Sequence, residues 1–210
     1  MSAADSLLPE ALRLVHVVDL RGAADGARLD ALLEGGVTCL WLRAPEATGR
    51  ALYDAAGALV LRCRRLRAAL LVGDRVDVAL AVGADGVELG ARAAPARAVR
   101  PWYRGWIGVS CHGAAEIAAA RDAGANHVVI SPVFGVPDKG APLGVEGLET
   151  LVREARGLPV VALGGIGENN VAAVRATGVA GVAAIRSLRD APDPAAAARL
   201  LAAPAAMTAS

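Results

Sequence analysis

The sequence predicts one α/β domain, a (β/α)8 TIM barrel of residues 1–202, followed by a C-terminal tail of residues 203–210. Three observations predict this fold. Four segments repeat one order of elements: an alanine-rich helix, a glycine and a short apolar run. The apolar runs are continuous rather than alternating, which is typical of parallel strands covered on both faces. The 210 residues also allow eight βα units of about 26 residues each, a lean form of a fold that usually takes ~250.

The repeated segments give the order of the elements. In each segment the glycine follows the last helical turn, where a left-handed residue readily ends a helix, and a strand begins two or three residues later. The four segments are residues 31–43, 79–89, 119–131 and 173–185. Filling the gaps between them predicts eight strands, at residues 14–18, 39–42, 69–72, 87–89, 107–109, 128–130, 160–163 and 182–185.

The end of the domain also has a local signal. Residues 193–202 predict a closing helix, with Asp193 as a possible N-cap and Pro194 in the first turn. The competing architecture is an open, doubly wound sheet. It is disfavoured because the glycines never form a GxGxxG motif after the first strand.

Composition excludes several classes of function. The formal net charge of +1 gives no basic surface for nucleic acid or for an anionic membrane. The longest stretch without a formal charge, residues 123–137, is about 15 residues and falls short of the ~20 that a bilayer crossing needs. An odd set of three cysteines without CxxC argues against a disulfide framework, and the first ten residues have no basic region typical of a signal peptide. We therefore expect a cytoplasmic protein.

The carboxyl ends of the second, third and fourth strands carry charged candidates. In barrels of this kind, polar residues at these ends are typical of function. Arg43 could bind a phosphate, or form a salt bridge at the rim. Asp74 could bind Mg²⁺, or cap the next helix. Glu88 lies in an apolar run and needs a metal, a proton or a partner. Asp74 and Glu88 could share one Mg²⁺; without a metal, one would be protonated or paired with Lys139.

The next loops add polar and aromatic candidates. Ser110 and His112 follow the fifth strand, and His112 could act as an acid or belong to the cap of the next helix. Lys139 lies in the longest loop, which is rich in proline and glycine; it could be delivered to an anionic ligand or remain solvated. Trp41, near the end of the second strand, could stack on a flat ring.

The last two loops predict a phosphate site. Gly164 and Gly165 follow the seventh strand and let backbone N–H groups approach a ligand closely. Ile185, Arg186 and Ser187 follow the eighth strand and precede a short helical turn. Barrels of this fold often bind phosphate between these two loops, where N–H groups at a helix start supply donors.

Several of these motifs together resemble one family. They are residues 31–38, 73–87, 108–112, 132–134, 142–148 and 159–166. In this order and spacing they resemble thiamine phosphate synthases, a family that also includes the TenI-type thiazole tautomerases.

The resemblance implies a reaction and a site. The synthases join hydroxymethylpyrimidine pyrophosphate to a thiazole phosphate and release pyrophosphate, through a pyrimidine cation that the thiazole nitrogen attacks. By resemblance, Arg43 and Lys139 hold the pyrophosphate, Asp74 holds Mg²⁺ and Ser110 faces the pyrimidine. Gly165 and the turn at Ile185, Arg186 and Ser187 bind the phosphate of the thiazole. The implied partners are small phosphorylated substrates, and a homodimer is expected.

The chain also departs from the family's pattern. The departures are Trp41 for glutamine, Pro45 for lysine, Gly73 for asparagine, Glu88 for histidine, Ala93 for the second metal-binding aspartate, and Val136 and Asp138 for two threonines. Losing one charged phosphate contact costs ~1.5–3 kcal/mol, or roughly 10- to 150-fold in affinity. Glu88 could replace the missing aspartate, and Trp41 could stack on the pyrimidine.

These departures leave three functions open. The first is a divergent synthase. The second is a thiazole-phosphate tautomerase, with Glu88 or His112 as the proton carrier and no need for Mg²⁺. The third is a non-catalytic barrel that binds thiamine phosphates.

Overall fold

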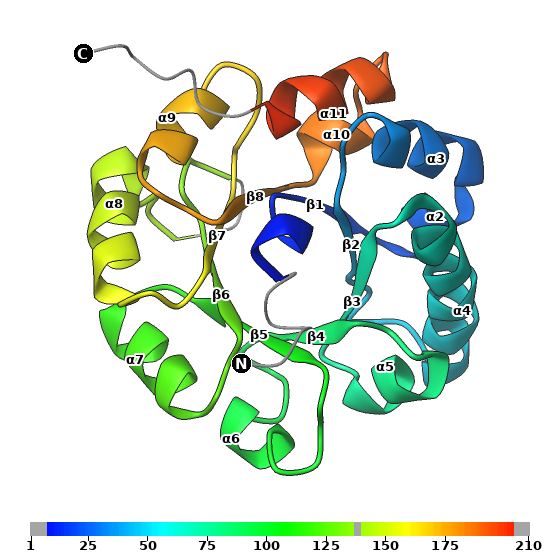
Figure 1. Ribbon diagram of the computed structural model, residues 1–210, viewed down its shortest axis with the longest axis horizontal. Coiled ribbons are helices and arrows are strands. Elements are labelled where there is room, and N and C mark those ends of the chain that lie inside the picture. Colours follow the sequence, from blue (N-terminus) through cyan, green and yellow to red (C-terminus); the bar gives the residue numbers. More distant parts are fainter. Residues whose placement is uncertain (1–7, 137–139, 204–210) are drawn as a thin grey trace.

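The computed structural model describes residues 8–136 and 140–203, and they form a closed barrel of eight parallel strands. Each strand pairs with the next in chain order, and β8 pairs with β1 (Figure 1). The predicted (β/α)8 fold is therefore confirmed. The strands are β1 (Leu14–Val18), β2 (Cys39–Leu42), β3 (Ala69–Gly73), β4 (Gly86–Leu89), β5 (Trp106–Cys111), β6 (His127–Ile130), β7 (Val160–Leu163) and β8 (Gly181–Ala184).

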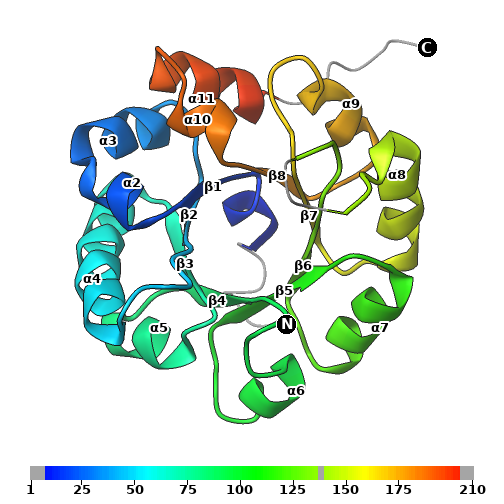
Figure 2. The ribbon, with the colours of Figure 1, turned by 180° about the vertical axis from the view of Figure 1, so that it is seen from behind.

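Helices surround the barrel on its outer face (Figures 1 and 2). They are α2 (Leu20–Ala24), α3 (Gly26–Glu34), α4 (Gly49–Leu66), α5 (Val76–Val82), α6 (Ala96–Val99), α7 (Ala114–Asp122), α8 (Gly144–Glu154), α9 (Val171–Ala176), α10 (Arg186–Arg189) and α11 (Pro194–Ala202). The closing helix α11 begins as predicted, because the Asp193 side chain accepts a hydrogen bond from the Ala196 N–H at 2.9 Å. Most of the predicted tail, residues 204–210, lies outside the described residues.

Strand residues alternate between two apolar cores. Leu40, Leu42 and Leu70 belong to the core between the strands and the helices, whereas Cys39, Trp41 and Leu71 belong to the core inside the barrel. This two-residue period follows from the pleat of a strand. The inside core fixes which side chains of each strand can reach a common site.

A helical turn before β1 fills one end of the barrel. Leu8 and Leu12 on this turn are buried and pack against the inside core. Figures 1 and 2 show the turn in the middle of the ring of strands. Since β1 begins only two residues after Leu12, the turn lies at the amino-terminal ends of the strands. The carboxyl ends are left as the open face.

Five strands differ from the predicted ranges. β3 ends one residue later than predicted, at Gly73, and β4 and β6 each begin one residue earlier, at Gly86 and His127. β5 extends to Cys111, past the predicted end at residue 109, and β8 begins at Gly181 and ends at Ala184, one residue earlier than predicted. The prediction rested on apolar runs, and it missed the small or polar residues at the strand ends. Ile185 consequently precedes α10 as its N-cap residue instead of ending β8.

Truncating the residue that fills the barrel end tests this packing. We expect Leu12→Ala to lower the free energy of unfolding by about 2–5 kcal/mol, because Leu12 is 1% exposed and the truncation leaves a cavity. Urea denaturation followed by circular dichroism measures the change. The matched control is Leu61→Ala on α4, where the leucine is 67% exposed and the change should stay within about 0.5 kcal/mol. Equal losses in both variants would contradict the assigned role of the turn.

Candidate active site

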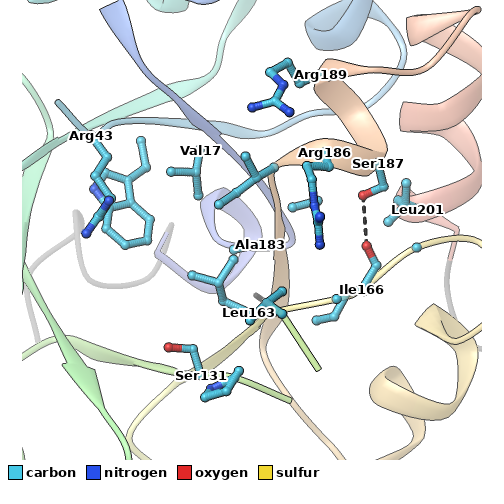
Figure 3. Close-up of a pocket in the computed structure, with 18 of the residues that line it drawn as sticks. Val17, Arg43, Ser131, Leu163, Ile166, Ala183, Arg186, Ser187, Arg189 and Leu201 are labelled. Carbon is cyan, nitrogen blue, oxygen red and sulfur yellow. Dashed lines mark hydrogen bonds between the residues drawn. The ribbon is translucent and has the colours of Figure 1, made fainter. Parts of the chain in front are cut away.

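A cavity of about 1250 Å³ opens at the carboxyl ends of the strands. Most of the sequence-predicted site residues line it: Trp41, Arg43, Asp74, Ser110, His112, Gly164, Gly165, Ile185, Arg186 and Ser187. They come from loops spread over the sequence, and Figure 3 shows Arg43 on one side of the cavity and Arg186, Ser187 and Ile166 on the other. Glu88 is not among the lining residues, and Lys139 lies outside the described residues.

Arginines supply the positive charge of the cavity wall. Arg43 directly follows β2, and its backbone N–H donates to the Val18 carbonyl at 2.8 Å, which continues the strand pairing to the cavity rim. Arg92 also lines the cavity, from the loop after β4, and forms an exposed ion pair with Glu46 at 3.4 Å. Arg92 was not predicted as a site residue, because no motif of the sequence marks it; it directly precedes Ala93.

Asp74 occupies a constrained position beside this positive wall. Its φ of +60° is left-handed, and its backbone N–H donates to the Glu88 carbonyl at 2.9 Å. The Oδ1 atom of Asp74 accepts a hydrogen bond from the Gly90 N–H at 2.7 Å. The alternative role as a helix cap is not observed, since α5 has Arg75 as its N-cap residue and no side-chain cap bond. Asp74 thus ties the loops after β3 and β4 together and leaves its second oxygen uncommitted by any hydrogen bond to the described residues.

Glu88 lies below the cavity rather than in its wall. The side chain is fully buried, and Oε2 lies 2.9 Å from Nε2 of His127, which is equally buried. Oε1 accepts a long hydrogen bond of 3.5 Å from the Ser110 hydroxyl. Burial raises the pKa of Glu88, and the hydrogen bond with His127 opposes that rise.

Among the described residues the partner of Glu88 is His127, which the sequence gave no reason to choose. A pairing with Lys139 falls outside the described residues. The Oδ1 atom of Asp74 is bonded to Gly90 and Oε2 of Glu88 to His127, and a Mg²⁺ shared by the two carboxylates stays a prediction. Within residues 8–136 and 140–203, no group of three or more histidine, cysteine or acidic side chains is arranged to hold a metal ion.

His112 has a defined tautomer. Its Nδ1 atom lies 2.6 Å from the Ser131 carbonyl oxygen. Because a carbonyl oxygen can only accept, Nδ1 carries the hydrogen of the neutral ring, and Nε2 is left as an acceptor. The backbone N–H of His112 donates to Glu116 at 2.6 Å, so the residue also belongs to the start of α7, and both sequence-based alternatives describe it in part.

Trp41 forms part of the cavity wall and is 4% exposed. Its indole Nε1 is buried without a hydrogen-bond partner among the described residues. A buried indole N–H usually has a partner, and none is found for this one among the described residues, so the contribution of Trp41 to the cavity is its ring.

The loops after β7 and β8 form the opposite end of the cavity. Gly164 and Gly165 have φ values of +110° and +66°, and a side chain at Gly165 would approach Phe134 to 2.7 Å. Two carbonyl oxygens of this loop are turned toward protein donors: Ser187 Oγ donates to Ile166 O at 2.8 Å (Figure 3), and Asn170 Nδ2 donates to Gly165 O at 2.9 Å. Acceptors that would repel an anion are thereby occupied, while the first N–H groups of α10 have no partner within the helix.

Fold and cavity together define a (β/α)8 barrel whose ligand site lies at the carboxyl ends of its strands. A family model described as "Thiamine monophosphate synthase" matches residues 14–188. The chain belongs to this family, as the motifs of the sequence indicated.

Individual relatives agree with this assignment. The chain is 43% identical to the "Thiamine biosynthesis bifunctional protein ThiM/ThiE" of Symbiobacterium thermophilum over 92% of its own length and 41% of that longer protein. It is 42% identical to the "Putative thiamine-phosphate synthase" of Geobacter sulfurreducens, covering 88% of this chain and 86% of that one. The solved structure of "Thiamine phosphate pyrophosphorylase from Pyrococcus furiosus" is similar with a TM-score of 0.85 and 36% identity, over 92% of this chain and 95% of that chain.

Breaking the buried pair tests its electrostatics. We expect His127→Leu to lower the free energy of unfolding by about 3–5 kcal/mol near neutral pH, because it leaves the Glu88 carboxylate buried and unpaired. A carboxyl whose pKa is raised in the folded state binds protons more tightly there, so the penalty should shrink as the pH falls from about 8 to about 5. Urea titrations at several pH values measure it.

The control for this prediction is the double variant His127→Leu with Glu88→Gln. It removes the ionisable group, so the pH-dependent part of the penalty should disappear. A penalty that stays constant with pH in His127→Leu would show that lost packing, and not an unpaired charge, is responsible.

Proposed function

We propose that the chain is a transferase of the thiamine-phosphate synthase type, which joins hydroxymethylpyrimidine diphosphate to a thiazole phosphate and releases diphosphate. The observation that carries the proposal is one cavity with arginines at two separate ends, each of which could bind an anion. One end has Arg43 and Asp74, and the other has the Gly164–Gly165 loop with Arg186 and Ser187. The relative at 42% identity carries the name "Putative thiamine-phosphate synthase".

The diphosphate would bind at the Arg43 end. A guanidinium can hold two phosphate oxygens at once, and Arg92 adds a second positive charge from the neighbouring loop. Asp74 has one carboxylate oxygen available, which suits Mg²⁺, since this ion is often held by one carboxylate together with substrate phosphates. When bound there, Mg²⁺ would offset the charge of the departing diphosphate. Lys139 as a further contact stays a prediction.

The thiazole phosphate would bind at the other end. Backbone N–H groups at Gly165 and at the start of α10 would donate to its oxygens, and Arg186 would balance its charge.

The chemistry then requires positioning and charge stabilisation. The bond between the pyrimidine methylene carbon and the diphosphate oxygen breaks, the oxygen keeps the electron pair, and the thiazole nitrogen forms the new bond to that carbon. Trp41 in the cavity wall would face the flat cationic ring, an arrangement that is favourable through its π electrons. Arg43 and Arg92 would stabilise the negative charge that develops on the leaving group.

One observation favours the alternative of a thiazole-phosphate tautomerase. The Nε2 atom of His112 is an acceptor at the cavity wall, which a proton carrier requires. This reaction would proceed without Mg²⁺ and would be lost in His112→Ala. Conversion of the thiazole phosphate alone, in EDTA, separates this function from the synthase.

The cellular setting is proposed from coarser features. All three cysteines are free and buried, which fits a reducing cytoplasm. No helix of the described residues is long and apolar enough to cross a membrane. A homodimer is proposed from the family, and sedimentation analysis checks it.

Asp74→Asn tests the synthase directly. The amide oxygen can still accept the Gly90 N–H, so the loop should persist while the negative charge is lost. With both substrates and Mg²⁺, we expect the wild type to make many thiamine phosphates per enzyme, and the variant to lose roughly 100-fold in kcat/KM. Asp54→Asn on α4, an exposed aspartate paired with Arg50, is the matched control and should be unaffected.

The wild-type reaction should also stop in EDTA. Absence of turnover in the wild type, with a known synthase active under the same conditions, would refute the proposed function.

Arg186→Ala tests the thiazole-phosphate end. We expect KM for the thiazole phosphate to rise about 10-fold or more, and KM for the pyrimidine diphosphate to stay unchanged, because one charged phosphate contact is lost. Steady-state kinetics with each substrate varied in turn measures both constants. Arg50→Ala, an exposed arginine on α4, serves as the control. An equal rise in both KM values would place Arg186 outside the thiazole-phosphate site.

A further inference from the structure

The register of three strands brings Glu88 and His127 together beneath the cavity. Glu88 on β4 lies opposite Gly108 on β5, and Gly108 lies opposite His127 on β6. A Cβ at Gly108 would overlap both the carboxylate and the imidazole. The glycine therefore provides the space in which the two side chains meet across the middle strand, and the pair has a fixed geometry.

The contacts of the pair assign a role to the second carboxylate oxygen. Oε2 of Glu88 is bonded to Nε2 of His127. Oε1 is left as the acceptor toward the cavity side. Its neighbour is the Ser110 hydroxyl at 3.5 Å, whose single hydrogen points to it. Ser110 is left with lone pairs only, and it lines the cavity.

The opposite side of the cavity offers an aromatic ring. Trp41, on β2, lines the cavity. Between β2 and β5, the cavity-lining positions Gly73 and Gly90 carry no side chains. A flat ring that stacks on Trp41 would meet the acceptor at Ser110 with a group on its edge.

We propose that Glu88 determines specificity by holding Ser110 as the hydrogen-bond acceptor for an amino group on the pyrimidine ring. A 4-aminopyrimidine presents an N–H donor on its edge, which complements the lone pairs of Ser110. A 4-oxopyrimidine presents an acceptor to Ser110 and is disfavoured. Glu88 touches no substrate and is a positioning residue. This inference rests on the proposed function, which supplies the pyrimidine.

Glu88→Gln reverses the hydrogen bond between residue 88 and Ser110 with little change in the shape of the side chain. The amide oxygen of the glutamine can keep the hydrogen bond with His127, so its NH₂ group faces Ser110. The hydroxyl of Ser110 must then accept from the glutamine, and its own hydrogen turns toward the cavity. The cavity would now offer a donor where the wild type offers an acceptor.

The experiment compares the 4-amino and 4-oxo forms of the pyrimidine diphosphate as substrates and, by calorimetry, as ligands. In the wild type we expect the amino form to be preferred, and in Glu88→Gln we expect that preference to fall about 10-fold or more. KM for the thiazole phosphate is the internal control and should stay within about twofold, since a single lost interaction at the pyrimidine does not reach the other end.

A second variant separates positioning from structure. Ser110→Ala should lose the amino preference by itself, and adding Glu88→Gln to it should change the preference no further, because Glu88 acts through the hydroxyl. If Glu88→Gln does not fold, Ser110→Ala alone still tests whether the Ser110 hydroxyl determines the amino preference.

Each outcome bears on one claim. Wild-type turnover with an unchanged amino preference in both variants would overturn this inference and leave the proposed function standing. Changes that affect both substrates equally would show a merely structural pair and overturn it as well. A wild type that neither turns over nor binds either pyrimidine would refute the proposed function, and this inference with it.

Discussion

The alternation of side chains along the strands of a closed barrel decides which residues of this protein can meet. Trp41, Glu88, Ser110 and His127 come from four different strands, yet they share the barrel interior or its mouth because each occupies an inward position. Leu12 and its neighbours fill the amino-terminal end. The interior can therefore open only at the carboxyl ends, and the cavity lies there.

Inside the barrel, the side chains form layers with different properties. The lower layer holds a carboxylate and an imidazole that are both removed from water, an arrangement that is costly unless the two groups bond each other. Gly108 makes that bond possible by leaving the middle strand without a side chain. Ser110, two residues further along β5, connects this buried layer to the cavity above. The buried pair of Glu88 and His127 thus contributes to the polarity of the cavity floor through Ser110.

Several arginines line the cavity, although positive and negative charges nearly cancel over the whole chain. The formal net charge is only +1, but arginines from several loops, Arg43, Arg92, Arg186 and Arg189, line the same space. At the end formed by the loops after β7 and β8, side-chain donors bond the carbonyl oxygens of Gly165 and Ile166. These bonds reduce the negative potential of that end. Asp74, Glu168 and Asp193 line the same cavity, so the arginines give it a small excess of positive charge.

The sequence by itself determined the barrel, the order of its strands, the capped start of α11 and most of the residues around the cavity mouth. These features follow from local signals: continuous apolar runs, glycines after helices, and polar residues directly after strands. Tertiary structure alone decided the partner of Glu88, the bond between Asp74 and Gly90, and the place of Arg92 in the cavity wall. The run around Glu88 shows that a buried carboxylate needs a partner, but His127 is 39 residues away. Which of the distant polar groups meets it depends on strand register and on the space at Gly108, and neither is encoded in the spacing of residues along the chain.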